Sequence, residues 1–106
     1  MYSRFDIYFV NLDPTIGSEI KKTRPCVIIS PDEMNRNIPT IIMAPLTSRL
    51  HSYPTRIACK VEGKQGQIVL DQIRTVGKTR LIKKIATLNK ATQTKVLTVL
   101  KEMFSE

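Results

Sequence analysis

Apolar residues in this chain come in short runs separated by turn-forming residues, a spacing typical of β-strands. The run Cys26–Ile29 contains no polar residue, so it predicts a strand buried on both faces. Pro25 restricts its own φ and pushes Arg24 towards extended geometry, which places the arginine at the entrance of a rigid strand. Pro31 and Asp32 stop the run and suit the first turn of a short helix.

Other segments rich in β-branched and aromatic residues predict further strands. The predicted strands span residues 6–12, 24–30, 39–46, 55–61, 67–76 and 80–85. Pro45 indicates that the third strand ends or bulges near that residue. A turn at residues 63–66 joins the fourth and fifth strands as a hairpin. The fifth strand alternates imperfectly because Asp71 stands among apolar neighbours.

From about Lys90 to Phe104 the apolar period changes to that of a helix, and Asn89 is the candidate N-cap. The predicted apolar stripe consists of Val96, Val99, Leu100 and Met103, widened by Leu97 and Phe104. We expect this helix to pack on the core as a lid. Many short strands with one terminal helix indicate an α+β, mostly β fold, a small antiparallel barrel with added helices.

The length of 106 residues predicts one domain, residues 1–106. Seventeen Lys and Arg against nine Asp and Glu give a formal charge of +8, which favours polyanionic partners such as nucleic acid, an anionic membrane surface or an acidic protein. No apolar run approaches the ~18 residues that span a bilayer, and the N-terminus does not resemble a signal peptide. We therefore expect a cytoplasmic protein.

The cysteines and the histidine do not suggest a redox or metal site. Cys26 and Cys59 lie in strand-like contexts without CxxC spacing, so we interpret them as small buried hydrophobes without a disulfide. His51 is the only histidine, and no cluster of ligand residues has metal-site spacing. We expect no metal and no cofactor.

Two features could bind an anion. Arg24 is either a solvated surface residue or a preorganised phosphate contact. The segment 13–23 is rich in Pro, Gly, Ser and Lys, and loops of that length are often binding loops or lids.

The sequence resembles the MazF/PemK (Kid) family of toxin–antitoxin ribonucleases over nearly its whole length. The matching motifs, in chain order, are DIY…NLDPTIGSE at 6–19, RP-VIISP…N at 24–35, PLTS at 45–48 and LDQIR at 70–74. Each motif alone would be weak, whereas all of them in order with the right gaps are specific.

The resemblance implies an SH3-like barrel of the CcdB/MazF type, acting as a homodimer. It also implies a metal-independent endoribonuclease that cuts single-stranded mRNA and is held inactive by a small acidic antitoxin. The family's arginine of the R-P motif corresponds to Arg24, and its hydroxyl residues to Thr47 and Ser48. Its loop glutamate falls on Glu19. Its D-Q pair falls on Asp71 and Gln72, and we assign this pair to RNA binding.

The chain departs from the family pattern at two positions. Phe5 replaces the glycine of a common R-G-D-I opening, which leaves the backbone course there open. Val69 stands where Kid-like members carry an arginine, so a mechanism that needs that arginine does not transfer. The MazF-like branch is therefore the closer comparison.

From the chemistry of the residues we expect Arg24 to stabilise the charge on phosphorus while the RNA 2′-OH attacks, giving a 2′,3′-cyclic phosphate and a 5′-OH. Thr47 and Ser48 would donate hydroxyls to the same phosphate. Glu19 is either the general base or a solvated carboxylate that pairs with a neighbouring lysine. We expect Asp71 to be a buried structural partner, one that orients Arg24 or caps backbone N–H groups.

The expected phosphate contacts are cations in loops and strand ends: Lys21, Lys22, Arg49 and Arg74. Tyr53 is available for base stacking, although one loop aromatic is more often a packing residue. Two other classes remain open, a CcdB-like toxin that binds a topoisomerase and a basic RNA-binding barrel without turnover.

Overall fold

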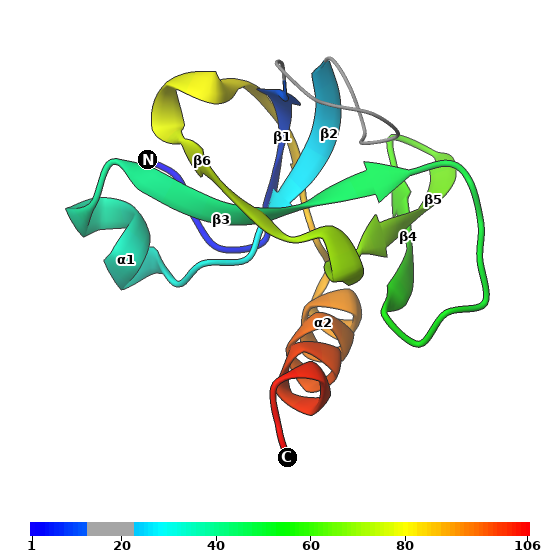
Figure 1. Cartoon of the computed structure of the whole chain (residues 1–106). Coiled ribbons are helices and arrows are strands. Elements are labelled where there is room, and N and C mark those ends of the chain that lie inside the picture. Colours follow the sequence, from blue (N-terminus) through cyan, green and yellow to red (C-terminus); the bar gives the residue numbers. More distant parts are fainter. Residues whose placement is uncertain (13–22) are drawn as a thin grey trace.

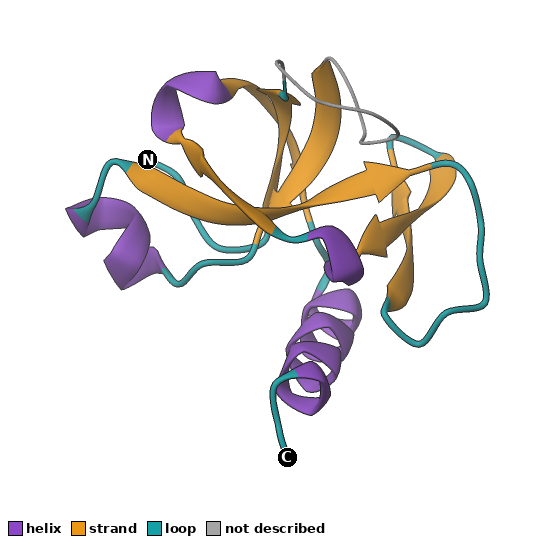
Figure 2. Ribbon diagram, in the orientation of Figure 1, coloured by secondary structure: helices purple, strands orange, loops and turns teal. Residues whose placement is uncertain are grey.

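The strands form one antiparallel sheet that curls into a half-barrel (Figure 1). The structure is a computed structural model, and it describes residues 1–12 and 23–106. The strands are β1 (Asp6–Asn11), β2 (Thr23–Ile28), β3 (Thr40–Thr47), β4 (Arg56–Val61), β5 (Lys64–Val69), β6 (Arg74–Gly77) and β7 (Leu81–Thr87). Their order is β4-β5-β3-β2-β1-β7, and β6 also pairs with β3. The helices are α1 (Asp32–Asn37) and α2 (Lys90–Met103), with short 3-10 turns η1 (Leu70–Gln72) and η2 (Lys78–Arg80). The mostly β fold with a C-terminal helix is as predicted (Figure 2).

The central strand β2 is buried on both faces, as its apolar run predicts. Val27 and Ile29 belong to the core cluster that α2 covers, while Cys26 and Ile28 belong to a second cluster on the other face. All of them have 5% or less of their surface exposed. The sheet therefore separates two cores, and β2 contributes to each.

Pro45 does not end β3, contrary to the prediction. It pairs with Cys26 of β2 inside the strand. On the opposite edge β3 pairs with β6 through residues 40–43 and with β5 through residues 46–47. Pro45 lacks an N–H, and it lies between the residues that pair with β6 and those that pair with β5, so no hydrogen bond to this edge is lost.

The predicted strand 67–76 is wrong, because the chain forms β5, the turn η1 and β6 instead. The break falls at Asp71, whose carboxylate is exposed and bound to Thr55 and Arg56. A charged residue held at the surface interrupts the alternation that a continuous strand needs.

The β4–β5 hairpin turns two residues earlier than predicted. Glu62 and Gly63 both have positive φ, at 51° and 79°, which is the requirement of a type I′ turn. Gly66 is consequently a strand residue, not a turn residue.

The C-terminal helix α2 is capped as predicted, since the Asn89 side chain accepts a hydrogen bond from the Thr92 amide at 2.9 Å. Val96 is fully buried, but Leu97 and Phe104 are 40% and 72% exposed and do not widen the packed stripe as expected. No helix in the described part of the chain is long and apolar enough to cross a membrane.

Candidate functional site

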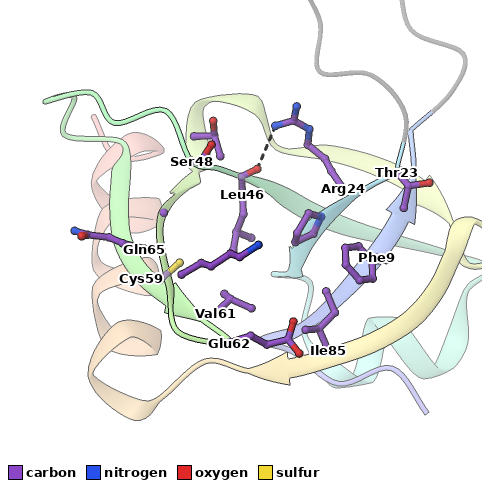
Figure 3. Close-up of a pocket in the computed structure, with 14 residues that line it drawn as sticks. Phe9, Thr23, Arg24, Leu46, Ser48, Cys59, Val61, Glu62, Gln65 and Ile85 are labelled. Carbon is purple, nitrogen blue, oxygen red and sulfur yellow. Dashed lines mark hydrogen bonds between the residues drawn. The ribbon is translucent and has the colours of Figure 1, made fainter.

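A pocket of about 370 Å³ opens between the β4–β5 hairpin and the strands β1, β2 and β7. Its lining residues are Phe9, Thr23, Arg24, Pro25, Leu46, Thr47, Ser48, Cys59, Val61, Glu62, Lys64, Gln65, Gly66 and Ile85. Figure 3 shows Arg24 and Ser48 at one end of the pocket and Glu62 at the other, beside Val61 and Ile85. Its volume lies in the lower range of small-ligand sites, ~300–1,000 Å³.

The pairing of β2 with β3 brings Arg24 and Thr47 together. Cys26 pairs with Pro45, and continuing that antiparallel register by two residues places Arg24 across from Thr47. Directly opposed residues in antiparallel strands present their side chains on the same face. Both residues line the pocket, so the sheet joins the two motifs that lie more than twenty residues apart in sequence.

The guanidinium of Arg24 is held at the pocket rim by the backbone of β3. Its Nη1 donates to the Leu46 carbonyl oxygen at 3.5 Å, drawn as the dashed line in Figure 3. No carboxylate in residues 1–12 or 23–106 forms an ion pair with it. Since guanidinium carries five N–H donors, most of them stay available to an oxyanion.

The hydroxyl of Thr47 is oriented by the start of the following loop. Its Oγ1 accepts a hydrogen bond from the Arg49 amide at 3.1 Å, so its own proton remains free to donate. Ser48 is exposed next to it, at the same end of the pocket. This end therefore combines a permanent cation with two hydroxyl donors.

Neither cysteine contributes a nucleophile. Burial raises the pKa of the Cys26 thiol to about 12, even though Arg24 and Arg74 act in the opposite direction. Burial also raises the pKa of Cys59, whose sulfur lies in the pocket wall. Both thiols are free, as expected of small buried hydrophobes.

The other predicted site residues lie apart from this pocket. Glu19, Lys21 and Lys22 fall outside the described residues. The structure does not bring Arg49, Asp71, Gln72 or Arg74 into the pocket lining.

Asp71 is neither buried nor a partner that orients Arg24, which corrects the prediction. Its carboxylate accepts from Arg56 Nε at 2.9 Å and Nη2 at 3.3 Å, and from the Thr55 hydroxyl at 2.9 Å. The hydrogen bond from Arg56 is the main reason that the pKa of Asp71 is lowered.

A stack of rings lies in the loop between β3 and β4. His51 and Tyr53 have ring centroids 4.9 Å apart and planes within 3° of parallel, and the Arg56 guanidinium lies 5.1 Å from the Tyr53 ring. The Gln67 amide bonds both backbone groups of His51, at 2.9 and 3.0 Å. Tyr53 is 52% exposed, so this pair packs on itself and still shows a face to solvent.

The sequence did not reveal the residues that complete the pocket. Phe9, Glu62, Lys64 and Ile85 carry no motif, and they meet only because the sheet curls. As for metals, no three His, Cys, Asp or Glu side chains gather in the described ranges as an ion site requires.

Known proteins share this fold. Residues 3–104 match the family of PemK-like, MazF-like toxins of type II toxin–antitoxin systems. The crystal structure of MazF (Form-I) from Deinococcus radiodurans superposes with a TM-score of 0.83 at 22% identity, covering 96% of this chain and 94% of that chain. An endoribonuclease in complex with its cognate antitoxin, from a mycobacterial species, superposes with a TM-score of 0.82 at 24% identity, covering 96% and 93%.

The half-barrel with its arginine-and-hydroxyl pocket therefore has the fold of the MazF toxins. The chain belongs to the PemK-like, MazF-like toxin family of type II toxin–antitoxin systems. Val69, where the resemblance places the arginine of Kid-like members, is buried, with 1% of its surface exposed.

Proposed function

We propose that this toxin is an endoribonuclease that cleaves single-stranded RNA at short sequence motifs without a metal ion. RNA carries its own nucleophile, so the protein need only stabilise charge on phosphorus and move protons. In this scheme the 2′ oxygen bonds to phosphorus, the bond from phosphorus to the 5′ oxygen breaks, and the 5′ oxygen takes up a proton. The products are a 2′,3′-cyclic phosphate and a 5′-OH.

Arg24 would carry the electrostatic part of this reaction. Its guanidinium is always cationic and can fork onto two phosphoryl oxygens. The single observation that carries the proposal is its position, held by the Leu46 carbonyl at the rim of a nucleotide-sized pocket without a described carboxylate to neutralise it.

Thr47 and Ser48 would donate hydroxyl protons to the same phosphate or orient the 2′-OH. The Arg49 amide already satisfies one acceptor site of Thr47, which directs the hydroxyl proton elsewhere. Glu19 remains our proposed general base. For the remaining RNA chain, Lys21, Lys22, Arg49 and Arg74 supply phosphate contacts, with Asp71 and Gln72 on the same binding surface.

The test is incubation of the purified protein with a long single-stranded RNA in EDTA, followed by mapping of both cut ends. We expect discrete cuts with cyclic phosphate and 5′-OH ends. In Arg24→Ala the rate should fall about 100- to 1,000-fold, the usual effect of removing a preorganised donor to an oxyanion. Arg36→Ala, which removes an exposed arginine outside the pocket, is the matched control.

Other results would contradict the proposal in distinct ways. A 5′-phosphate at the cut would refute attack by the 2′-OH, and activity that disappears in EDTA and returns with a divalent ion would refute metal independence. Binding without cuts would indicate an RNA-binding module. Inhibition of a topoisomerase with intact RNA would indicate a CcdB-like poison.

For partners, we propose a homodimer and a cognate acidic antitoxin in the cytoplasm. The formal charge of +8 favours an acidic protein that competes with RNA. The mycobacterial relative in complex with its antitoxin supports the second partner.

A further inference from the structure

The pocket that begins at Arg24 continues well beyond the group that would hold a phosphate. Between its ends lie apolar side chains from four strands, those of Phe9, Leu46, Val61 and Ile85. A flat aromatic face and aliphatic side chains suit a nucleobase, since unstacked RNA bases are commonly held against aromatic residues. The lining of the pocket thus suits both parts of a nucleotide, with the phosphate at the Arg24 end and the base among the apolar side chains.

The tip of the β4–β5 hairpin brings an opposite pair of charges to the pocket. Glu62, a residue of the turn, lies at the far end, and Lys64, the first residue of β5, also lines the pocket. Within the described part of the chain neither side chain makes a hydrogen bond or ion pair with another residue. Both are therefore free to bind a ligand in the pocket.

Glu62 also stands at a position where glutamate is a poor choice for stability. Its φ is +51°, in the left-handed region, and it is followed by Gly63 at +79°. The first central residue of such a turn is usually Asn, Asp or Gly. An unfavoured residue held in a strained conformation at the end of a pocket suggests that its side chain is retained for binding.

One base matches this end better than the others. The Watson–Crick edge of guanine offers two adjacent N–H donors, which a carboxylate can accept together, and beside them a carbonyl oxygen for an ammonium group. Adenine and cytosine present one amino donor next to an acceptor, and uracil presents one donor between two carbonyls. Only guanine gives the carboxylate two donors and also presents a carbonyl oxygen to the ammonium group.

We propose that this pocket binds a guanine base next to the scissile phosphate, with Glu62 as the specificity-determining residue and Lys64 at the guanine O6. The inference rests on the proposed function for its substrate. It assigns the hairpin tip to base recognition and the Arg24 end to the phosphate.

The experiment compares wild type, Glu62→Gln and Glu62→Asn on short RNAs that place guanosine, inosine or adenosine beside the mapped cut. Wild type should prefer guanosine, and inosine, which lacks the amino group, should lower kcat/KM about tenfold to hundredfold. Glu62→Gln should erase that difference. Glu62→Asn should also erase it while raising Tm by about 2–4 °C, because Asn suits the turn.

Glu102→Gln, on the exposed end of α2 and outside the pocket, is the matched control and should keep the wild-type preference. Cuts without a guanosine preference, or a preference that survives in both Glu62 variants, would overturn the inference and leave the nuclease proposal intact.

Binding of guanosine and adenosine 5′-monophosphates, followed by NMR, distinguishes a failure of the function from a failure of the pocket. If no RNA is cleaved, the nuclease proposal fails. If the protein still binds the guanosine nucleotide selectively and Glu62→Gln abolishes that binding, the guanine site is supported. Equal binding of the two nucleotides, or none, overturns the site.

Discussion

Phe5 adopts a backbone conformation that glycine usually supplies. Its φ is +73°, its side chain is 7% exposed, and the Arg4 guanidinium lies 5.5 Å above its ring. The chain therefore follows a left-handed turn here without a glycine. The left-handed conformation costs about 1–2 kcal/mol, and burial of the aromatic ring contributes about 1.5–3 kcal/mol, which offsets it.

The pair of Arg56 and Asp71 gives the fold a predictable dependence on pH. The folded state lowers the pKa of Asp71 from its ordinary value of 3.8, chiefly through Arg56. The stabilisation is therefore complete above that ordinary value, and it is lost as the pH falls through the lower folded value. Since 35% of the Asp71 side chain is exposed, we expect at most about 1 kcal/mol.

Thermal unfolding of wild type and Asp71→Asn across the acid range checks this. Asp71→Asn should lower Tm at pH 7 by up to about 4–8 °C, and the two curves should converge towards pH 2. A Tm difference between the two proteins that stays constant at every pH would show that the variant loses packing and not a charge interaction. Glu102→Gln, which removes an exposed carboxylate outside this pair, should follow the wild-type curve.

At the scale of elements, the close approach of β5 to β3 sets the position of Thr47. A Cβ built on Gly66 would lie 2.8 Å from the Thr47 carbonyl oxygen, which is a backbone atom and cannot move alone. Thr47 itself pairs with Gln67 at the end of this ladder. Any side chain at residue 66 must therefore push the Thr47 end of β3 away from β5.

Gly66→Ala should consequently lower stability by about 1–3 kcal/mol and lower RNA cleavage at least tenfold. Denaturant unfolding and kcat/KM on one RNA measure the two effects. The matched control is Gly77→Ala, where the nearest neighbour to a Cβ is the Thr79 Oγ1 at an ordinary 3.7 Å. Equal effects in both variants would contradict a specific role for the contact of β5 with β3.

The elements that the sequence predicted best are those with strong local signals. The apolar run of β2 and the Asn89 cap of α2 were both confirmed. The break at Asp71 was missed because its cause is a partner fifteen residues away, Arg56, and not a local breaker. The effect of Pro45 was also predicted wrongly. Whether its missing N–H breaks a strand depends on which strands lie beside it, and the sequence does not show them.

At the scale of the whole molecule, the excess of positive charge predicts RNA binding that weakens with salt. Each phosphate contact should add about 0.7 to the slope of log K against log salt concentration for a single strand. Arg49→Ala should therefore reduce the slope by about 0.7 for every RNA sequence, because a phosphate contact carries no base information.

An RNA with 2′-deoxy nucleotides at the cut allows binding to be measured without turnover, between 50 and 300 mM salt as a rough range. Lys101→Ala, an exposed cation at the far end of α2, is the control and should leave the slope unchanged. The same change in both variants would mean that the net charge, and not a defined RNA path, governs binding.

The amino-acid sequence by itself determined the mostly β fold, the buried character of β2, the cap of α2 and the family, because each depends on residues that are neighbours in the chain or on motifs in order. It also singled out Arg24, Thr47 and Ser48. Their convergence was decided by the tertiary structure, through the register of β2 against β3.

The rest of the pocket was decided entirely by the curl of the sheet. Phe9, Glu62 and Ile85 lie on different strands or turns, and nothing in their local sequence relates them. Curvature arises from the summed twist of all the strands and from the packing of two cores, so no short stretch of sequence encodes it. The position of the β4–β5 hairpin tip relative to the Arg24 guanidinium therefore depends on the curvature of the whole sheet.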